Sequence, residues 1–131
     1  MENSRAMIWT GRVFSGLVIL FMLFDVTIKF LDLPIVETTG RQLGLPAHAG
    51  RGLAVMETVI LLLYAVPRTS VLGAVLFTGL FGGTMAMHWR LGDPLFTHVL
   101  FGFYLALLAW GGIWLRDERL RRLLPFVRNE G

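Results

Sequence analysis

The sequence contains no cysteine, and only 16% of its 131 residues are charged. Without cysteine, the chain by itself forms no disulfide, thiol relay, cysteine-ligated zinc site or iron–sulfur cluster. So little charge is untypical of a soluble domain, in which about a quarter of the residues are charged. Hydrophobic residues instead make up 55% of the chain, which predicts a membrane protein.

A basic patch of the kind that binds nucleic acid is also missing. The formal net charge is +3 at pH 7, but the arginines flank apolar runs and do not gather with aromatic residues on a polar face. Arginine at the ends of apolar runs is typical of membrane edges. We therefore expect a lipid bilayer as the environment and no nucleic-acid partner.

Four apolar stretches have, or approach, the length of about 18 residues at which a helix can cross the hydrocarbon core. They cover residues 8–31, 51–66, 70–89 and 95–115, and the second is short for a crossing. The first is too long for the apolar part of a signal peptide, and no small-x-small cleavage site follows it. The sequence therefore predicts one all-α domain over residues 1–131, a polytopic four-helix membrane bundle.

The segments outside the spans predict the topology. Pro34 and Gly44 would begin and end a short interfacial helix, although an ordered loop fits this segment as well. Arginine and lysine are more frequent on the side of the two termini, so both termini are expected to be cytoplasmic, in the inner membrane of a bacterium.

The tail over residues 116–131 is predicted to lie on that same membrane face as a basic amphipathic segment. Its apolar side would hold Leu120, Leu123, Leu124 and Val127, and its arginines elsewhere are Arg119, Arg121, Arg122 and Arg128.

Ionisable residues occur near the outward end of the spans, where burying one charge costs about 2.5 to 3.5 kcal/mol. Asp25 and Lys29 are spaced i,i+4 and are close enough to pair on one helix face. Within one helical turn of Glu57, no basic residue is expected to point into the bundle. The candidate partners of Glu57 are Lys29, His88, Arg90, His98 or a proton of its own.

The stretch from His88 to His98 joins the last two spans through a turn with Asp93 and Pro94 at its centre. Arg90 is expected to pair with Asp93 across this turn, and Asp93 also suits a helix cap. The two histidines are either polar helix rims or ligands of a haem or a metal, together with Glu57 or Asp93. Their spacing is not diagnostic of either group, so no metal site is predicted.

Small residues in the later spans indicate close helix packing. Gly79 and Gly83 form a small-xxx-small pair, accompanied in the third span by Gly73, Gly82 and Ala86. The helix faces that carry these small residues would pack inside the bundle, or against another membrane protein or a second copy of the chain. In the fourth span, the stripe expected to point inward holds His98, Gly102, Leu105, Ala109 and Gly112.

Several motifs lie along nearly the whole chain: Phe24-Asp25 with Lys29-Phe30, Pro67-Arg68-Thr69, Gly82-Gly83, Gly92-Asp93-Pro94, Trp110-Gly111-Gly112 and Leu115-Arg116-Asp117. In these motifs the sequence resembles the DoxX-like family of small bacterial membrane proteins. The resemblance implies a four-helix membrane bundle from a family named after a small subunit associated with quinone-linked sulfur oxidation in archaea. It implies no catalytic residues.

These observations favour a protein that is not an enzyme on its own. The leading hypothesis is an accessory part of a membrane redox process, which binds a small molecule such as a quinone in an outward-facing polar pocket. Asp25 and Glu57 would hold protons, and the mouth would be lined by His88, Arg90, Asp93 and His98. The alternative is an assembly module without chemistry of its own. A small proton-linked carrier fits less well, because no inverted repeat or broken helix is seen.

Overall fold

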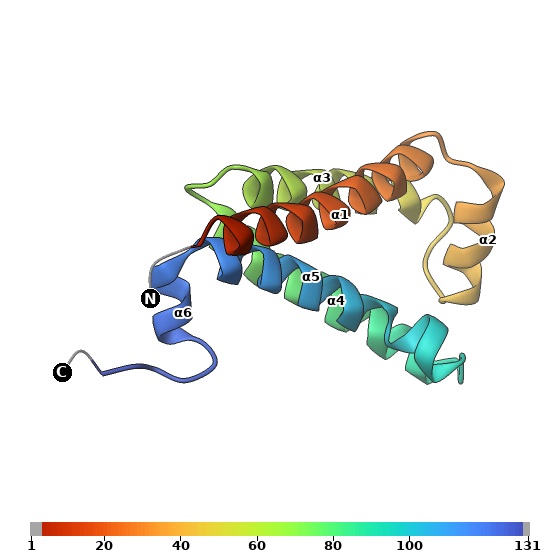
Figure 1. Ribbon diagram of the computed structural model, residues 1–131. Helices are drawn as coiled ribbons and strands as arrows, with labels where there is room; N and C mark the ends of the chain where they lie inside the picture. Colours follow the sequence, from red (N-terminus) through yellow and green to blue (C-terminus); the bar gives the residue numbers. More distant parts are fainter. Residues whose placement is uncertain (1–3, 130–131) are drawn as a thin grey trace.

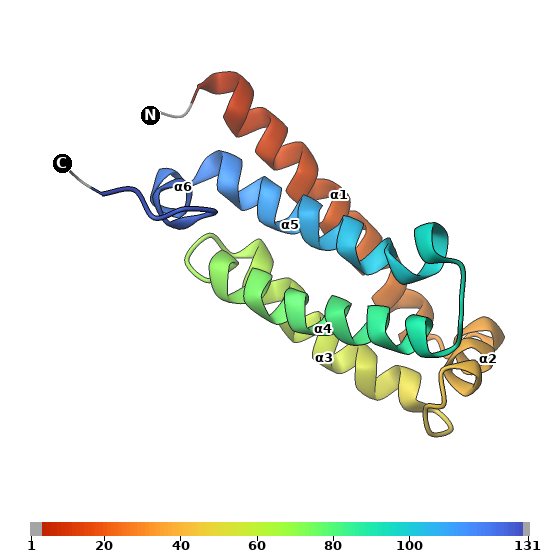
Figure 2. The same cartoon turned by 90° about the horizontal axis from the view of Figure 1, so that it is seen from below.

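The computed structural model describes residues 4–129, and within them it is all-helical. The elements are α1 (Arg5–Phe30), α2 (Pro34–Gln42), α3 (Ala49–Ala65), α4 (Ser70–Arg90), a π-helical turn η1 (Leu95–Val99), α5 (Phe101–Arg116) and α6 (Glu118–Leu123). The four long helices form a closed ring of neighbours, in which α1 packs on α3 and α5, and α4 packs on the same two helices (Figures 1 and 2). The predicted all-α class is confirmed.

Three helical segments of the described chain are long and apolar enough to cross a membrane: Arg5–Phe30, Ser70–Arg90 and Leu95–Arg116. They correspond to three of the four predicted spans, and the chain is a multi-pass membrane protein. Helix α3 has 17 residues. At 1.5 Å per residue it is about 25 Å long, shorter than a hydrocarbon core of about 30 Å. A fourth crossing is therefore not confirmed.

The bundle buries several small residues between its helices and leaves many large apolar side chains exposed, as expected for a protein surrounded by lipid. In α1 the buried residues are Gly11, Ser15, Val18, Met22 and Val26, which recur every three or four residues along one helical face. Leu20 and Phe24, on the other side of the same helix, are 67% and 63% exposed. This pattern leaves the apolar side chains on the outer face of α1 available to acyl chains.

Two glycine contacts set the distances between the helices. A Cβ atom on Gly11 would lie 2.6 Å from the carbonyl oxygen of Gly112, and a Cβ atom on Gly73 would overlap the backbone of Tyr64. These contacts hold α1 against α5 and α3 against α4, where no larger residue fits.

The small-xxx-small pair does not pack inside the bundle. A Cβ atom added to Gly79, Gly82 or Gly83 would meet nothing within 4 Å, and all three glycines are exposed. Of the predicted contact glycines in this span, Gly73 is the one that packs against a neighbouring helix. The others form an open outer face of α4, because they lie on the side of the helix opposite Gly73, Phe77 and Phe81.

Both ends of the described chain lie at one end of the bundle, and α2 and η1 lie at the other (Figures 1 and 2). Segment α2 is a helix and not merely an ordered loop. Pro34 occupies its first turn, where the missing amide costs nothing. Gly44 follows the helix with a φ of +79°, a conformation that favours glycine.

Two predicted side-chain orientations are wrong. His98 is exposed and Val99 is buried in its place, because the π-helical turn adds a residue and shifts the inward-facing register. In the tail, Arg121 is only 3% exposed and donates to the carbonyl oxygens of Trp114 and Leu115. The tail is thus a short helix folded onto the end of α5, followed by a non-helical segment.

Candidate functional site

Lys29 lies at the centre of a charged cluster between α1 and α3. Its Nζ is 2.6 Å from Oδ2 of Asp25 and 2.6 Å from Oε1 of Glu57. The predicted i,i+4 pair of Asp25 and Lys29 is confirmed, and of the alternatives for Glu57 the structure has Lys29 as its partner. The side chain of Glu57 is 4% exposed, so the cluster reaches deep into the bundle.

The second carboxylate oxygen of Glu57, Oε2, is buried and lacks a hydrogen-bond donor among the described residues. A buried acceptor without a donor costs about 1 to 3 kcal/mol. One ammonium group also faces two carboxylates, so a proton held by the cluster would complete the charge balance. The cluster therefore suits a bound hydrogen-bond donor or an exchangeable proton.

An inner cavity of about 150 Å³ adjoins this cluster. Asp25, Lys29 and Glu57 form its polar wall. The remaining lining residues are Phe21, Met22, Leu80, Phe81, Thr84, Phe101, Gly102 and Leu105, which are mostly apolar. A largely apolar cavity with a few convergent polar groups is typical of a small-molecule site.

An outer cavity of about 460 Å³ lies at the end of the bundle near α2. Its lining consists of Thr39, Gln42, Leu43, His88, Leu91, Asp93 and His98. Thr84 in the inner cavity and His88 in the outer one are one helical turn apart on α4. The two cavities are therefore neighbours along α4, with the charged cluster on the inner side.

His88 and Asp93 pair in the wall of the outer cavity. His88 Nδ1 is 2.6 Å from Asp93 Oδ2. A carboxylate that accepts the Nδ1 proton orients the ring and leaves Nε2 as an acceptor. The ring of His98 lies edge-on to that of His88, with centroids 5.9 Å apart. The two histidines thus meet at the cavity although His98 is not directed into the bundle.

The predicted pairing of Arg90 with Asp93 is wrong. Arg90 instead donates from Nη2 to the carbonyl oxygen of Leu43 at 3.0 Å, and Asp93 pairs with His88. Asp93 is also not a side-chain cap, since Pro94 occupies the cap position of η1. Arg90 therefore ties the end of α2 to the end of α4 beside the outer cavity.

A polar network at the opposite end of the bundle was missed from the sequence. The hydroxyl of Tyr64 donates to the carbonyl oxygen of Ala109 at 2.6 Å and lies 2.7 Å from Ser15 Oγ. Arg116 Nη2 donates to Ser15 Oγ at 2.9 Å. Tyr64 occurs in an apolar run with no polar neighbour to signal it. The network is internally satisfied, which indicates a structural role.

In a comparison with protein families, the model of the DoxX-like family matches residues 13–112. The chain belongs to the DoxX-like family. Comparison with curated proteins and with solved structures gives no match. The resemblance stated from the motifs is thus confirmed, and the matched segment of this DoxX-like protein includes both cavities and the charged cluster. Helix α6 lies outside that segment.

Proposed function

We propose that this DoxX-like protein binds a small molecule at the end of the bundle that carries the two cavities, and that it serves there as an accessory part of a membrane redox process. The observation that carries the proposal is the unmatched Oε2 of Glu57 in a cavity whose other walls are mostly apolar. A buried polar atom of this kind is satisfied by a ligand or by a transferable proton. A quinone-like molecule is the ligand that we propose.

Each residue has a separate role in this proposal. The aromatic walls formed by Phe21, Phe81 and Phe101 would contact a flat ring. Lys29 would donate to a ring oxygen, and Glu57 would accept a hydroxyl proton or hold a proton beside it. The histidines of the outer cavity would line the entrance. Electrons would come from a partner redox protein, since the proposed role is accessory.

The membrane arrangement is part of the same proposal. We infer that α3 is a fourth crossing, that both termini are cytoplasmic and that the protein lies in the bacterial inner membrane. The support is the ring of four helices, in which α3 packs between α1 and α4, together with the excess of arginine and lysine toward the termini. The cavities would then open to the outer side.

The test is a ligand measurement on the purified full chain in mild detergent. We expect mass spectrometry of an organic extract to find a quinone, and added quinone to raise the melting temperature of the wild type but not of Glu57→Gln. Glu118→Gln is the matched control, because Glu118 belongs to α6 at the far end. Absence of a quinone together with no thermal shift would reject the proposal.

The outer face of α4 supports a second candidate function, an assembly module. Gly79, Gly82 and Gly83 leave room for another helix to approach closely. In that case Gly79→Leu or Gly83→Leu abolishes co-purification of a partner, whereas Glu57→Gln leaves the assembly intact. Gly16→Leu is the control, because Gly16 also has open space around it but lies on α1. An equal effect of Gly16→Leu would contradict this role for α4.

A further inference from the structure

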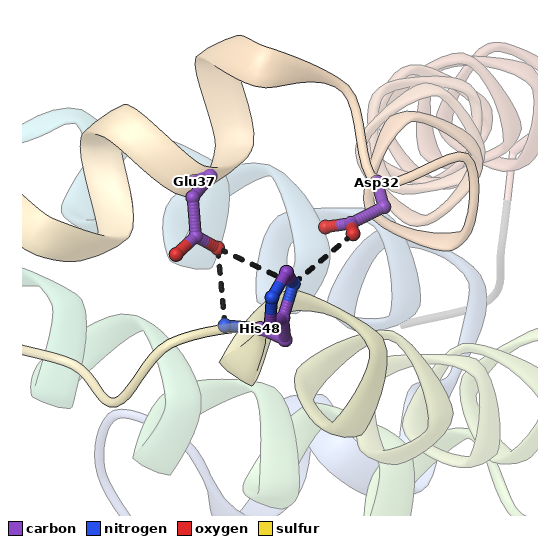
Figure 3. A group of neighbouring side chains, drawn as sticks. All are labelled: Asp32, Glu37 and His48. Carbon is purple, nitrogen blue, oxygen red and sulfur yellow. Dashed lines mark hydrogen bonds and ion pairs between the residues drawn. The ribbon is translucent and has the colours of Figure 1, made fainter.

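Three side chains converge at the junction of α1, α2 and α3 (Figure 3). Asp32 comes from the turn after α1, Glu37 from α2 and His48 from the residue before α3. His48 Nδ1 is 3.3 Å from Asp32 Oδ2 and 4.0 Å from Glu37 Oε2. One potential ligand atom from each residue lies within 4.8 Å of the other two. The donor set is one imidazole nitrogen and two carboxylate oxygens.

Each of the two carboxylates also has an oxygen atom that accepts no hydrogen bond from the described residues. These atoms are Asp32 Oδ1 and Glu37 Oε1, and both are buried, with no hydrogen-bond partner among residues 4–129. Figure 3 shows that the two oxygens of Asp32 face the gap between Glu37 and His48. One imidazole N–H cannot serve two carboxylates at once. Among the described residues, the junction therefore offers fewer hydrogen-bond donors than its two carboxylates can accept.

Arg41 does not supply the missing donor. Its Nε is 3.5 Å from Glu37 Oε1, outside hydrogen-bonding geometry, and its side chain is 75% exposed. An exposed pair of this kind is weakened by water and salt. The carboxylate oxygens nearest His48 Nδ1 are Asp32 Oδ2 and Glu37 Oε2, and a cation seated between the three side chains would meet these two oxygens.

Two backbone N–H groups already hold part of this arrangement. The N–H of His48 donates to Glu37 Oε2 at 3.0 Å, which joins α2 to the start of α3. The N–H of Asp32 donates to the carbonyl oxygen of Lys29 at 3.1 Å. A cation would thus bind where the Glu37 carboxylate and the backbone of Asp32 are already positioned, which lowers the free-energy cost of ordering the site.

We propose that Asp32, Glu37 and His48 bind a divalent cation such as Zn²⁺ or Mn²⁺. Mixed imidazole and carboxylate ligands suit these ions. Ca²⁺ takes six to eight oxygen ligands, and Mg²⁺ keeps most of its water, so both fit this set less well. The side chain of His48 is 74% exposed, so water or an external ligand completes the coordination.

The cation would also act on the outer cavity. Thr39 and Gln42, farther along α2 than Glu37, line that cavity. Binding at the junction fastens α2 to the ends of α1 and α3. Because α2 is then held more firmly, the cation shapes the wall of the outer cavity without entering it. The proposed site does not depend on what the cavity binds.

The test is calorimetric titration of the purified full chain with Zn²⁺, Mn²⁺ and Mg²⁺, without added quinone. We expect one Zn²⁺ or Mn²⁺ per chain, with weaker binding of Mg²⁺. His48→Ala and Asp32→Asn should each weaken Zn²⁺ binding by at least about tenfold. Glu118→Gln is the matched control and should bind like the wild type. Zn²⁺ should also raise the melting temperature of the wild type and not of His48→Ala.

Several results would overturn the proposal. They are no saturable binding to the wild type, equal loss of affinity in Glu118→Gln, or full affinity in His48→Ala. Circular dichroism and gel filtration identify a variant that fails to fold. His48→Ala remains decisive if Asp32→Asn unfolds, because the His48 side chain is largely exposed and contributes little to the core. A negative quinone test would leave these outcomes unchanged.

Discussion

At the scale of single residues, Lys29 connects two helices through its two carboxylate partners. Asp25 lies one turn away on the same helix, so its pairing follows from local geometry alone. Glu57 lies 28 positions away, and its pairing requires α1 and α3 to pack in one register. The first contact was predictable from spacing and the second was one of several alternatives. The sequence distance between partners explains this difference.

Replacing Lys29 tests the charged cluster. We expect Lys29→Met to destabilise the protein by about 3 kcal/mol, because removing one partner of a buried pair leaves the other charge uncompensated. Lys29→Met combined with Glu57→Gln should recover part of that loss, since the double variant no longer buries the unpaired carboxylate of Glu57. Thermal unfolding in detergent measures both. A double variant less stable than Lys29→Met would contradict this account.

At the scale of elements, local signals predicted where helices begin and end better than which way they face. Proline at the start of α2 and glycine after its end marked that helix correctly. The inward stripe of α5, with Gly102, Leu105 and Ala109 buried, also agrees with the helical period. The π-helical turn had no recognisable signal, and the direction of His98 was consequently wrong. The extra residue in the π-helical turn rotates the side chains before it, about the helix axis, relative to the side chains of α5.

The contact between α3 and α4 is tested by a pair of glycine substitutions. Gly73→Ala places a methyl group on the backbone of Tyr64, so we expect a loss of stability of about 1 to 3 kcal/mol from overpacking. Gly82→Ala on the same helix meets nothing within 4 Å and should raise stability by up to about 1 kcal/mol through helix propensity. Melting temperatures of the two variants give the comparison. Equal effects would mean that α3 and α4 pack less closely.

At the scale of the whole molecule, the number of crossings decides where the cavities open. Two cavities and the Asp32–Glu37–His48 junction lie toward the end of the bundle opposite the termini. If all four long helices cross, the tail shares a side of the membrane with the N-terminus. If α3 does not cross, the tail lies on the opposite side from the N-terminus. The side on which the tail lies therefore distinguishes the two topologies.

The natural absence of cysteine makes this topology directly measurable. We expect a membrane-impermeant maleimide to label Thr97→Cys in intact cells, and to label Arg68→Cys and Arg128→Cys only after the membrane is opened. Thr97 lies in η1 and is exposed, so its labelling does not require unfolding. The unmodified protein is the control. Labelling of Arg128→Cys in intact cells would contradict the proposed cytoplasmic tail.

The sequence by itself determined that this chain is a helical membrane protein of the DoxX-like family, and it placed Asp25 beside Lys29. These properties depend on composition, hydropathy and spacing within a few residues, which act locally. Only the tertiary structure decided that Lys29 meets Glu57, that Asp93 meets His88 and not Arg90, that Gly79 and Gly83 face outward, and that Asp32, Glu37 and His48 converge. Those contacts depend on the packing of whole helices, because hydrophobic period specifies which residues turn inward but not which residue of another helix they meet.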